Sequence, residues 1–263
     1  MTRVKIAEIA EINFVRSGPK NAPSLVFLHA IGMDLTWWEH QIAEFAPHYD
    51  VIALDLPGHG LSGKLDFPTF DAMAQIVAGL LEHVGVRGAH VVGLSISGMI
   101  AQTLAIKRPD LVRSLSLVST RSTFPAAGRQ AMSEFAGMAR RDGMLKMAQL
   151  LNERMFPEPF RALRPDVLDR MTKALLLQDK DFHASIWEMI STFDVESQLH
   201  NIKCPTMVVI GAADLQANQE AGSNLARKIS GAVLREVPDA GHLPPVQTPE
   251  QFNTLLRSFL SIE

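Results

Sequence analysis

The stretch VVGLSISGMI (91–100) places a serine between an apolar run and a second apolar run with helical spacing. A serine at a tight strand-to-helix turn exposes its hydroxyl beside the free N–H groups of a helix N-terminus, where it can act as a nucleophile. Such a turn requires small residues two positions before and after the serine, and Gly93 and Ser97 meet this requirement around Ser95. If Ser97 were the nucleophile, the bulky Met99 would occupy the second of these positions. We therefore predict that Ser95 is the nucleophile.

A serine hydroxyl needs a base to take its proton, and the base needs a group that orients it. Asp214 follows the apolar run TMVVIG (206–211), and His242 follows the run VLREVP (233–238). Both positions lie beyond the carboxyl ends of predicted strands, where open parallel sheets bind ligands. The chain order serine, acid, histidine is the one that accompanies a strand–serine–helix turn. The run after the elbow helix ends in LVSTRST without a carboxylate, so we expect Asp214 to be the acid and His242 the base.

Backbone N–H groups are expected to stabilise the oxyanion that forms when a serine attacks a carbonyl. One predicted donor is the N–H of Ile96, which directly follows Ser95. The second is the N–H of Ile31 in the loop HAIG (29–32), which also follows an apolar run. We interpret His29 in the same loop as a structural hydrogen-bonding residue.

Short apolar runs alternate with helical patterns along the chain and would position these groups. The predicted strands cover residues 24–30, 50–56, 89–95, 112–120, 206–212 and 232–238, and the clearest predicted helices cover residues 69–84, 97–107, 219–229 and 249–262. Several strands are apolar almost throughout, as expected where helices cover both faces of a sheet. The pattern predicts an α/β fold with a mainly parallel, doubly wound sheet, and residues 4–16 alternate as in an antiparallel edge hairpin.

One region interrupts this alternation. Residues 123–193 contain no convincing strand, and their helical patterns are rich in methionine and separated by prolines. We expect this segment to be an all-helical cap inserted into a core of residues 1–122 and 194–263. Seventy residues exceed what two ordinary crossover helices would need.

The composition, 47% hydrophobic and 20% charged, fits an ordinary soluble protein. The net charge of −3 offers no electrostatic footprint for a nucleic acid, and no apolar run approaches the roughly 20 residues of a membrane helix. The N-terminus leads into no apolar signal core, and the single cysteine, Cys204, excludes an internal disulfide. These features suit the cytoplasm. The sequence indicates no oligomeric state.

No cofactor and no metal are expected. The stretch GHGLSGKL (58–65) approaches a phosphate-binding loop, but a hydroxyl residue is missing after its lysine and Pro68 stands where a helix should begin. The nine histidines show no metal-ligand spacing.

Five segments taken together resemble the α/β-hydrolase superfamily over nearly the whole chain: HAIG, DLPGHGLS, VVGLSISGMIAQ, GAAD and AGHLPP. The stretches HAIGMDLTWWEHQI and NERMFPEPFRALRPDVLDRM are similar to the 3-oxoadipate enol-lactonase-like group. The resemblance implies an α/β-hydrolase fold and a cofactor-free enzyme of aromatic catabolism. The sequence departs from the family pattern at Ala30 and Ser97, where glycine is usual, and at Met155, where tryptophan is usual.

The resemblance also implies a role for one cap residue. The family's E-R-W-F segment corresponds to residues 153–156, and Arg154 matches its arginine. A guanidinium binds a carboxylate through two parallel hydrogen bonds, so Arg154 is a candidate partner for a substrate carboxylate. The alternative is a solvated helix arginine.

The predicted activity is hydrolysis of a small ester or lactone, with an enol-lactone favoured, through an acyl-enzyme on Ser95. The same triad could instead cleave a carbon–carbon bond or run perhydrolysis, and the scaffold could serve as a ligand-sensing protein without turnover. The candidates for lining the substrate pocket could each belong to the core instead. They are Trp37, Trp38, Met99, Phe124, Arg154, Met155, Phe156 and Trp187.

Overall fold

The computed structural model describes residues 2–6 and 10–261, and within them eight strands form one sheet in the order β1-β2-β4-β3-β5-β6-β7-β8. The strands are β1 (Thr2–Ile6), β2 (Ala10–Ser17), β3 (Ser24–Leu28), β4 (Asp50–Leu54), β5 (Ala89–Leu94), β6 (Val112–Val118), β7 (Thr206–Gly211) and β8 (Val233–Val237). β2 pairs antiparallel with both β1 and β4, and the other neighbouring pairs are parallel. The predicted mainly parallel sheet with an antiparallel edge is confirmed, although the residues that join β1 to β2, 7–9, lie outside the described residues.

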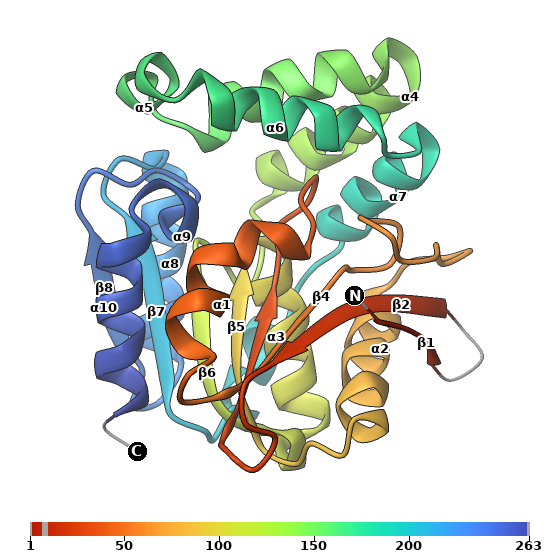
Figure 1. Cartoon of the computed structure of the whole chain (residues 1–263). Helices are drawn as coiled ribbons and strands as arrows, with labels where there is room; N and C mark the ends of the chain where they lie inside the picture. The colour runs from red at the N-terminus through yellow and green to blue at the C-terminus, as the bar shows by residue number, and fades with distance from the viewer. Residues whose placement is uncertain (1, 7–9, 262–263) are drawn as a thin grey trace.

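Helices cover both faces of this sheet (Figure 1). The helices of the core are α1 (Glu39–Phe45), α2 (Phe70–His83), α3 (Ile96–Lys107), α8 (Gln216–Lys228), α9 (Pro244–Gln247) and α10 (Pro249–Leu260), with 3₁₀ turns η1 (Leu35–Trp38), η2 (Pro109–Leu111) and η3 (Glu196–Asn201). Every residue of β4, β5 and β7 is buried, which explains why these strands are mostly apolar rather than alternating. The helix α3 is buried from Ile96 to Ala105, so the turn at its N-terminus rests on a rigid element.

The helix predicted over 219–229 begins three residues earlier, at Gln216. Its first turn is polar, Gln216-Ala217-Asn218, and lacks the apolar periodicity on which the prediction depended. Of this turn, the Asn218 side chain donates back to Asp214, which follows β7.

Four helices lie between β6 and β7 and gather at one end of the sheet (Figure 1). They are α4 (Ala126–Met155), α5 (Glu158–Leu163), α6 (Pro165–Leu176) and α7 (Lys180–Ser191). A break at Gly143, with φ of 77°, divides α4 in two. Thr123 and Asp194 form an isolated antiparallel bridge, so the two ends of the insertion lie side by side. The division into separate domains at residues 123 and 193 stays a prediction. Among the described residues, no helix combines the length and apolarity needed to cross a membrane.

His183 of α7 is buried and held in its neutral form. Its Nε2 accepts a hydrogen bond from Trp187 Nε1 at 2.9 Å, so its proton is on Nδ1, which lies 2.8 Å from Gln178 Oε1. Burial lowers the pKa of His183 to about 4. A second proton would face the Trp187 N–H and would be buried as an unpaired charge.

Because the pKa of His183 is lowered in the folded protein, we expect the free energy of unfolding to fall in mild acid. The unfolded chain, with a histidine pKa of about 6.5, takes up the proton well before the folded protein does, so stability is lost as pH falls from 6.5 toward 4. His183 alone should lower the free energy of unfolding by about 2 kcal/mol between pH 7 and pH 5. Urea unfolding at both pH values, compared with His183→Gln, tests this: the variant should lose less stability on acidification, and an equal loss would contradict the assignment.

Candidate active site

Ser95 occupies a sharp turn between β5 and α3, with φ of 57° and ψ of −115°. A positive φ is uncommon for a residue with a side chain and marks a constrained backbone. The turn needs a glycine at position 93, because a Cβ there would lie 2.4 Å from the Ser97 carbonyl oxygen. The Ser95 N–H donates to the Val118 carbonyl of the neighbouring strand at 2.8 Å, which fixes the turn to the sheet.

Ser97 fits the position where the family pattern has glycine. It is fully buried, and its hydroxyl donates to the His29 carbonyl oxygen. The turn that carries Ser95 is thereby fastened to the loop that contains Ile31. This loop is also held by His29, whose Nε2 accepts from the Leu56 N–H at 2.9 Å and whose Nδ1 lies 2.8 Å from the Ala30 carbonyl oxygen.

Ser97→Gly is therefore expected to cost stability but little activity. Loss of the bond to His29 and the greater freedom of glycine should lower the free energy of unfolding by about 1–2 kcal/mol. The value of kcat should stay within about threefold, because Ser95 and its partners keep their places. Urea unfolding and steady-state kinetics measure both quantities. Gly93→Ala is the contrasting variant, because its Cβ would clash with the turn and should lower both the free energy of unfolding and kcat. A large loss of kcat in Ser97→Gly would contradict the prediction and would mean that the Ser97 hydroxyl takes part in the chemistry.

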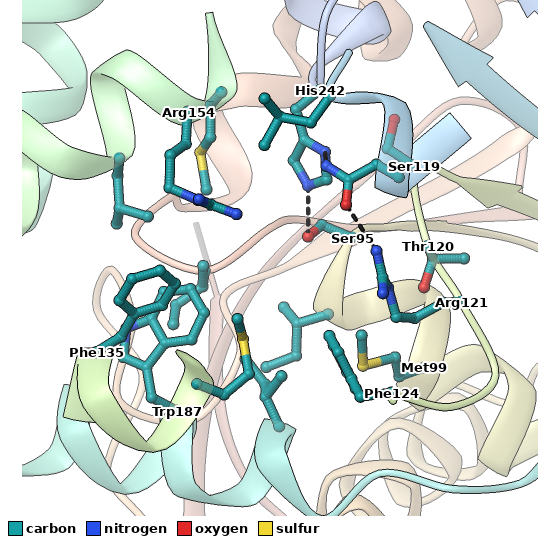
Figure 2. A pocket seen from close by; sticks show the side chains of 18 residues that line it. Ser95, Met99, Ser119, Thr120, Arg121, Phe124, Phe135, Arg154, Trp187 and His242 are labelled. Carbon is teal, nitrogen blue, oxygen red and sulfur yellow. Dashed lines mark hydrogen bonds between the residues drawn. The ribbon is translucent and has the colours of Figure 1, made fainter. Parts of the chain in front are cut away.

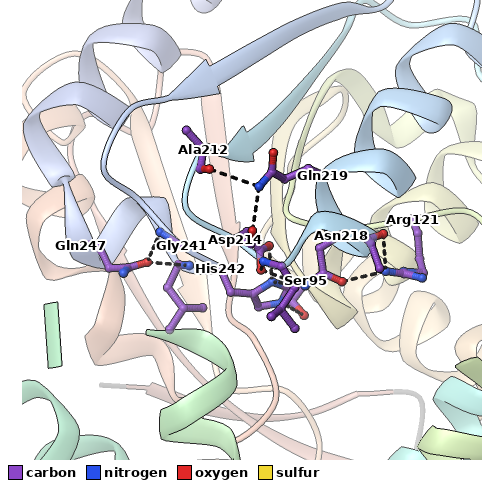
Figure 3. A network of polar contacts seen from close by, with 12 residues as sticks. Ser95, Arg121, Ala212, Asp214, Asn218, Gln219, Gly241, His242 and Gln247 are labelled. Carbon is purple, nitrogen blue, oxygen red and sulfur yellow. Dashed lines mark hydrogen bonds and ion pairs between the residues drawn. The ribbon is translucent and has the colours of Figure 1, made fainter. Parts of the chain in front are cut away.

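The structure brings the three predicted catalytic side chains into one chain of hydrogen bonds (Figure 3). His242 Nε2 lies 2.9 Å from Ser95 Oγ, and His242 Nδ1 lies 2.8 Å from Asp214 Oδ2. The Asp214 side chain is almost wholly buried, whereas 13% of the His242 side-chain surface is exposed to solvent. These are the distances over which a histidine can take a proton from a serine and an aspartate can orient that histidine.

The environment of Asp214 keeps its carboxylate ionised. Burial acts to raise its pKa, but the charge and hydrogen bond of His242, together with hydrogen bonds from Asn218 and the Leu215 N–H, hold the pKa below its ordinary value. Oδ1 accepts from the Leu215 N–H at 2.7 Å and from Asn218 Nδ2 at 2.9 Å, which leaves Oδ2 for His242.

Two glutamines fix the loops that carry the acid and the histidine (Figure 3). Gln219 Nε2 donates to the Asp214 carbonyl oxygen at 2.7 Å. Gln247 Oε1 accepts from the N–H groups of Gly241 and Leu243, both at 3.0 Å. The His242 N–H itself donates to the carbonyl oxygen of Met155 at 3.1 Å, so the cap is bonded directly to the histidine loop.

The two predicted oxyanion donors, Ile31 and Ile96, both line the cavity that contains Ser95. Neither backbone N–H donates to another residue in the described part of the chain. Both amides are therefore available to an oxygen atom beside Ser95.

Five of the eight predicted pocket residues line this cavity, between the sheet and the cap (Figure 2). They are Met99, Phe124, Arg154, Met155 and Trp187. Arg154 extends from the end of α4 into the cavity, with its guanidinium 5.2 Å from the centre of the Phe135 ring.

The prediction was wrong for Trp37, Trp38 and Phe156, which pack elsewhere. Trp38 stacks on Phe27 with ring centres 4.8 Å apart, and Phe156 stacks on Phe160 at 5.3 Å. The Trp37 ring lies under the Arg170 guanidinium at 4.4 Å. Their sequence positions near the oxyanion loop and the cap segment did not reveal which way the side chains turn.

Two residues at the site, Asn218 and Arg121, are not among those that the sequence predicts. Asn218 lies four residues after Asp214, one helical turn along the polar start of α8, and this spacing could have revealed it. Arg121 follows β6 at the same edge of the sheet, in the segment LVSTRST, which has no carboxylate and no periodicity that would mark a binding residue. In the described part of the chain, no group of three or more His, Cys, Asp or Glu side chains could hold a metal ion.

Comparison with known proteins agrees with this geometry. A family model described as "alpha/beta hydrolase fold" matches residues 23–249. The 3-oxoadipate enol-lactonase 2 of Acinetobacter baylyi is 30% identical over 94% of this chain and 92% of its own length. The crystal structure of the enol-lactonase from Burkholderia xenovorans matches with a TM-score of 0.93 at 27% identity, over 99% of this chain and 100% of that one. A thermophilic esterase from Thermogutta terrifontis with malate bound matches with a TM-score of 0.91 at 29% identity, over 99% and 98%. The chain therefore belongs to the α/β-hydrolase family, in which it resembles the enol-lactonases, and it is a hydrolase.

Proposed function

We propose that the protein hydrolyses a small ester or lactone that carries a carboxylate, using Ser95, His242 and Asp214 as its catalytic triad. The observation that carries this proposal is the continuous hydrogen-bond chain from Ser95 Oγ through His242 to Asp214, at a cavity between sheet and cap. Similarity to an enol-lactonase and to an esterase supports the same reaction type.

The reaction begins when Ser95 Oγ attacks the carbonyl carbon and its proton passes to His242 Nε2. Asp214 accepts the hydrogen bond from His242 Nδ1 and stabilises the imidazolium. The N–H groups of Ile96 and Ile31 stabilise the oxyanion. When the tetrahedral intermediate collapses, the bond to the leaving oxygen breaks and His242 returns the proton to that oxygen. Water then gives a proton to His242 Nε2 and attacks the acyl carbon. The bond from that carbon to Ser95 Oγ breaks, and His242 returns the proton to Oγ.

The lining of the cavity supports a small substrate with an acidic group. Apart from the triad and its neighbours, its walls are mainly apolar side chains, into which Arg154 introduces a positive charge. A guanidinium at the end of an apolar pocket recognises a carboxylate by charge-assisted hydrogen bonds. An enol-lactone with a free carboxylate combines the ester bond with such a group, and the relative from Acinetobacter baylyi carries that substrate in its name.

Steady-state hydrolysis of 3-oxoadipate enol-lactone and of neutral phenyl acetate by Arg154→Ala tests the proposal. We expect the variant to lose about 10- to 100-fold in kcat/KM for the lactone and little for the neutral ester, because only the lactone has a charge to pair. Arg141→Ala, on the exposed side of α4, is the matched control. An equal loss of kcat/KM on both substrates would contradict the proposal that the substrate carries a carboxylate. If the wild type hydrolysed neither substrate, the proposed reaction itself would be wrong.

A further inference from the structure

A second arginine lies in the same cavity, on the other side of Ser95. Arg121 follows β6 in the core, whereas Arg154 comes from the cap helix α4. Figure 2 shows their guanidinium groups on either side of the Ser95 hydroxyl. Both side chains line the cavity, so a molecule bound over Ser95 would have one cation beside each of its ends.

No carboxylate in the lining of the cavity pairs with either of these two cations. The lining contains Arg121, Arg154 and His242 but no aspartate or glutamate. Neither arginine forms a salt bridge with another described residue. Burial lowers the pKa of Arg121, the nearby Asp214 raises it and the charge of Arg154 lowers it again, so each arginine lies within the electrostatic reach of the other. Two unpaired cations that line one cavity, Arg121 half-buried and Arg154 exposed, favour an anionic ligand.

The guanidinium of Arg121 is held in place by contacts with the first turn of α8 and with Phe124. Its Nη2 donates to Asn218 Oδ1 at 2.7 Å and to the Ala217 carbonyl oxygen at 3.3 Å. One face of its guanidinium covers the Phe124 ring, 4.6 Å from the ring centre. Nε and Nη1 donate to no residue in the described part of the chain, so they remain available for a ligand.

Two hydroxyl groups beside Arg121 also lack partners. Ser119 and Thr120 immediately precede it, line the cavity and are 5% and 3% exposed. Their Oγ and Oγ1 atoms are buried without a hydrogen-bond partner among the described residues. Ser119 has a positive φ of 47°, a conformation that the surrounding structure must maintain. Buried hydroxyls without partners are costly in a native protein and point to a bound group that satisfies them.

We propose that Arg121, Ser119 and Thr120 form a second anion-binding subsite, so that the preferred substrate carries an acidic group on each side of its scissile carbonyl. Arg154 binds one of these groups and Arg121 the other. The inference rests on the proposed ester hydrolysis and extends it, because a substrate with a single carboxylate would leave one of the two cations unpaired.

Aryl esters with the charge at different ends test the inference. Phenyl hydrogen succinate has its carboxylate in the acyl part, 3-carboxyphenyl acetate has it in the leaving group, and phenyl acetate is neutral. For Arg121→Gln, Arg154→Gln and the surface control Arg141→Gln, the quantity measured is kcat/KM for each anionic ester divided by that for phenyl acetate. The division removes any general effect of Arg121 on catalysis through Asn218.

We expect Arg121→Gln to lower this ratio about 10- to 100-fold for one anionic ester and Arg154→Gln to lower it similarly for the other. Arg141→Gln should change neither ratio. A measurement on the wild type alone adds a check that does not depend on folding of a variant: glutarate, with two carboxylates, should inhibit phenyl acetate hydrolysis at least about tenfold more strongly than butyrate.

The inference is overturned if both arginine variants impair the same anionic ester, if Arg121→Gln leaves both ratios unchanged, or if glutarate and butyrate inhibit equally. These results would leave hydrolysis of phenyl acetate through Ser95 intact. Failure of the proposed function looks different, because Ser95→Ala would then retain that hydrolysis.

Discussion

Ser95→Ala is expected to lower kcat for ester hydrolysis by about 10⁵- to 10⁶-fold. Removal of the hydroxyl deletes the atom that forms the acyl-enzyme, and a water molecule in its place lacks the covalent attachment to the turn. The oxyanion amides and the cavity remain, so residual turnover above the uncatalysed rate is expected. Single-turnover and steady-state assays measure the loss.

The fold should survive this substitution, because alanine and serine meet the same restriction at φ of 57°. Circular dichroism and urea unfolding check that point. An aryl phosphonate ester provides a second test: the wild type should gain the mass of the phosphonyl group, and Ser95→Ala should not. A folded Ser95→Ala protein with wild-type kcat would refute the mechanism.

Asp214→Asn is expected to lower kcat by about 10⁴-fold with little change in structure. The oxygen of the new amide must take the place of Oδ1, because two donors, the Leu215 N–H and Asn218 Nδ2, point at that atom. The amide nitrogen then faces His242 Nδ1 and donates to it. The proton of the imidazole moves to Nε2, where it faces Ser95, and His242 can no longer accept the serine proton.

Asp239→Asn is the matched control for this experiment. Asp239 is close to His242 in sequence, but it is exposed at a turn with φ of 60°, a conformation that asparagine tolerates as well as aspartate does. Its kcat should equal that of the wild type. If the two variants lost activity equally, the orienting role would not belong to Asp214.

The architecture and the positions of the proposed catalytic side chains were predictable because their signals are local. Strands buried on both faces are apolar throughout, and a serine between Gly93 and Ser97 marks a turn that larger neighbours could not form. The chain order of Ser95, Asp214 and His242, each after a strand, then placed all three at one edge of the sheet.

The lining of the pocket was only partly predictable because it depends on how side chains turn after the backbone has folded. Trp38 lies near the oxyanion loop in sequence, but its ring packs under Phe27, in the core. Arg121, in the segment after β6, and Asn218, in the first turn of α8, meet at the site although they lie 97 residues apart, and no periodicity reveals this contact. From the sequence alone, the polar first turn of α8 looks like an ordinary exposed turn, because nothing in it shows that it lies beside the segment that follows β6.

The bond between the His242 N–H and the Met155 carbonyl has a consequence for how caps diversify among such enzymes. Because the link uses main-chain atoms, it sets the path of the chain at position 155 but leaves the side chain free to vary. Methionine can therefore replace tryptophan there without disturbing the histidine. A cap transplanted from another scaffold would have to reproduce this backbone path, whatever its sequence, before the recipient could work. A substitution at position 155 can thus change the wall of the cavity without moving the main chain that holds His242.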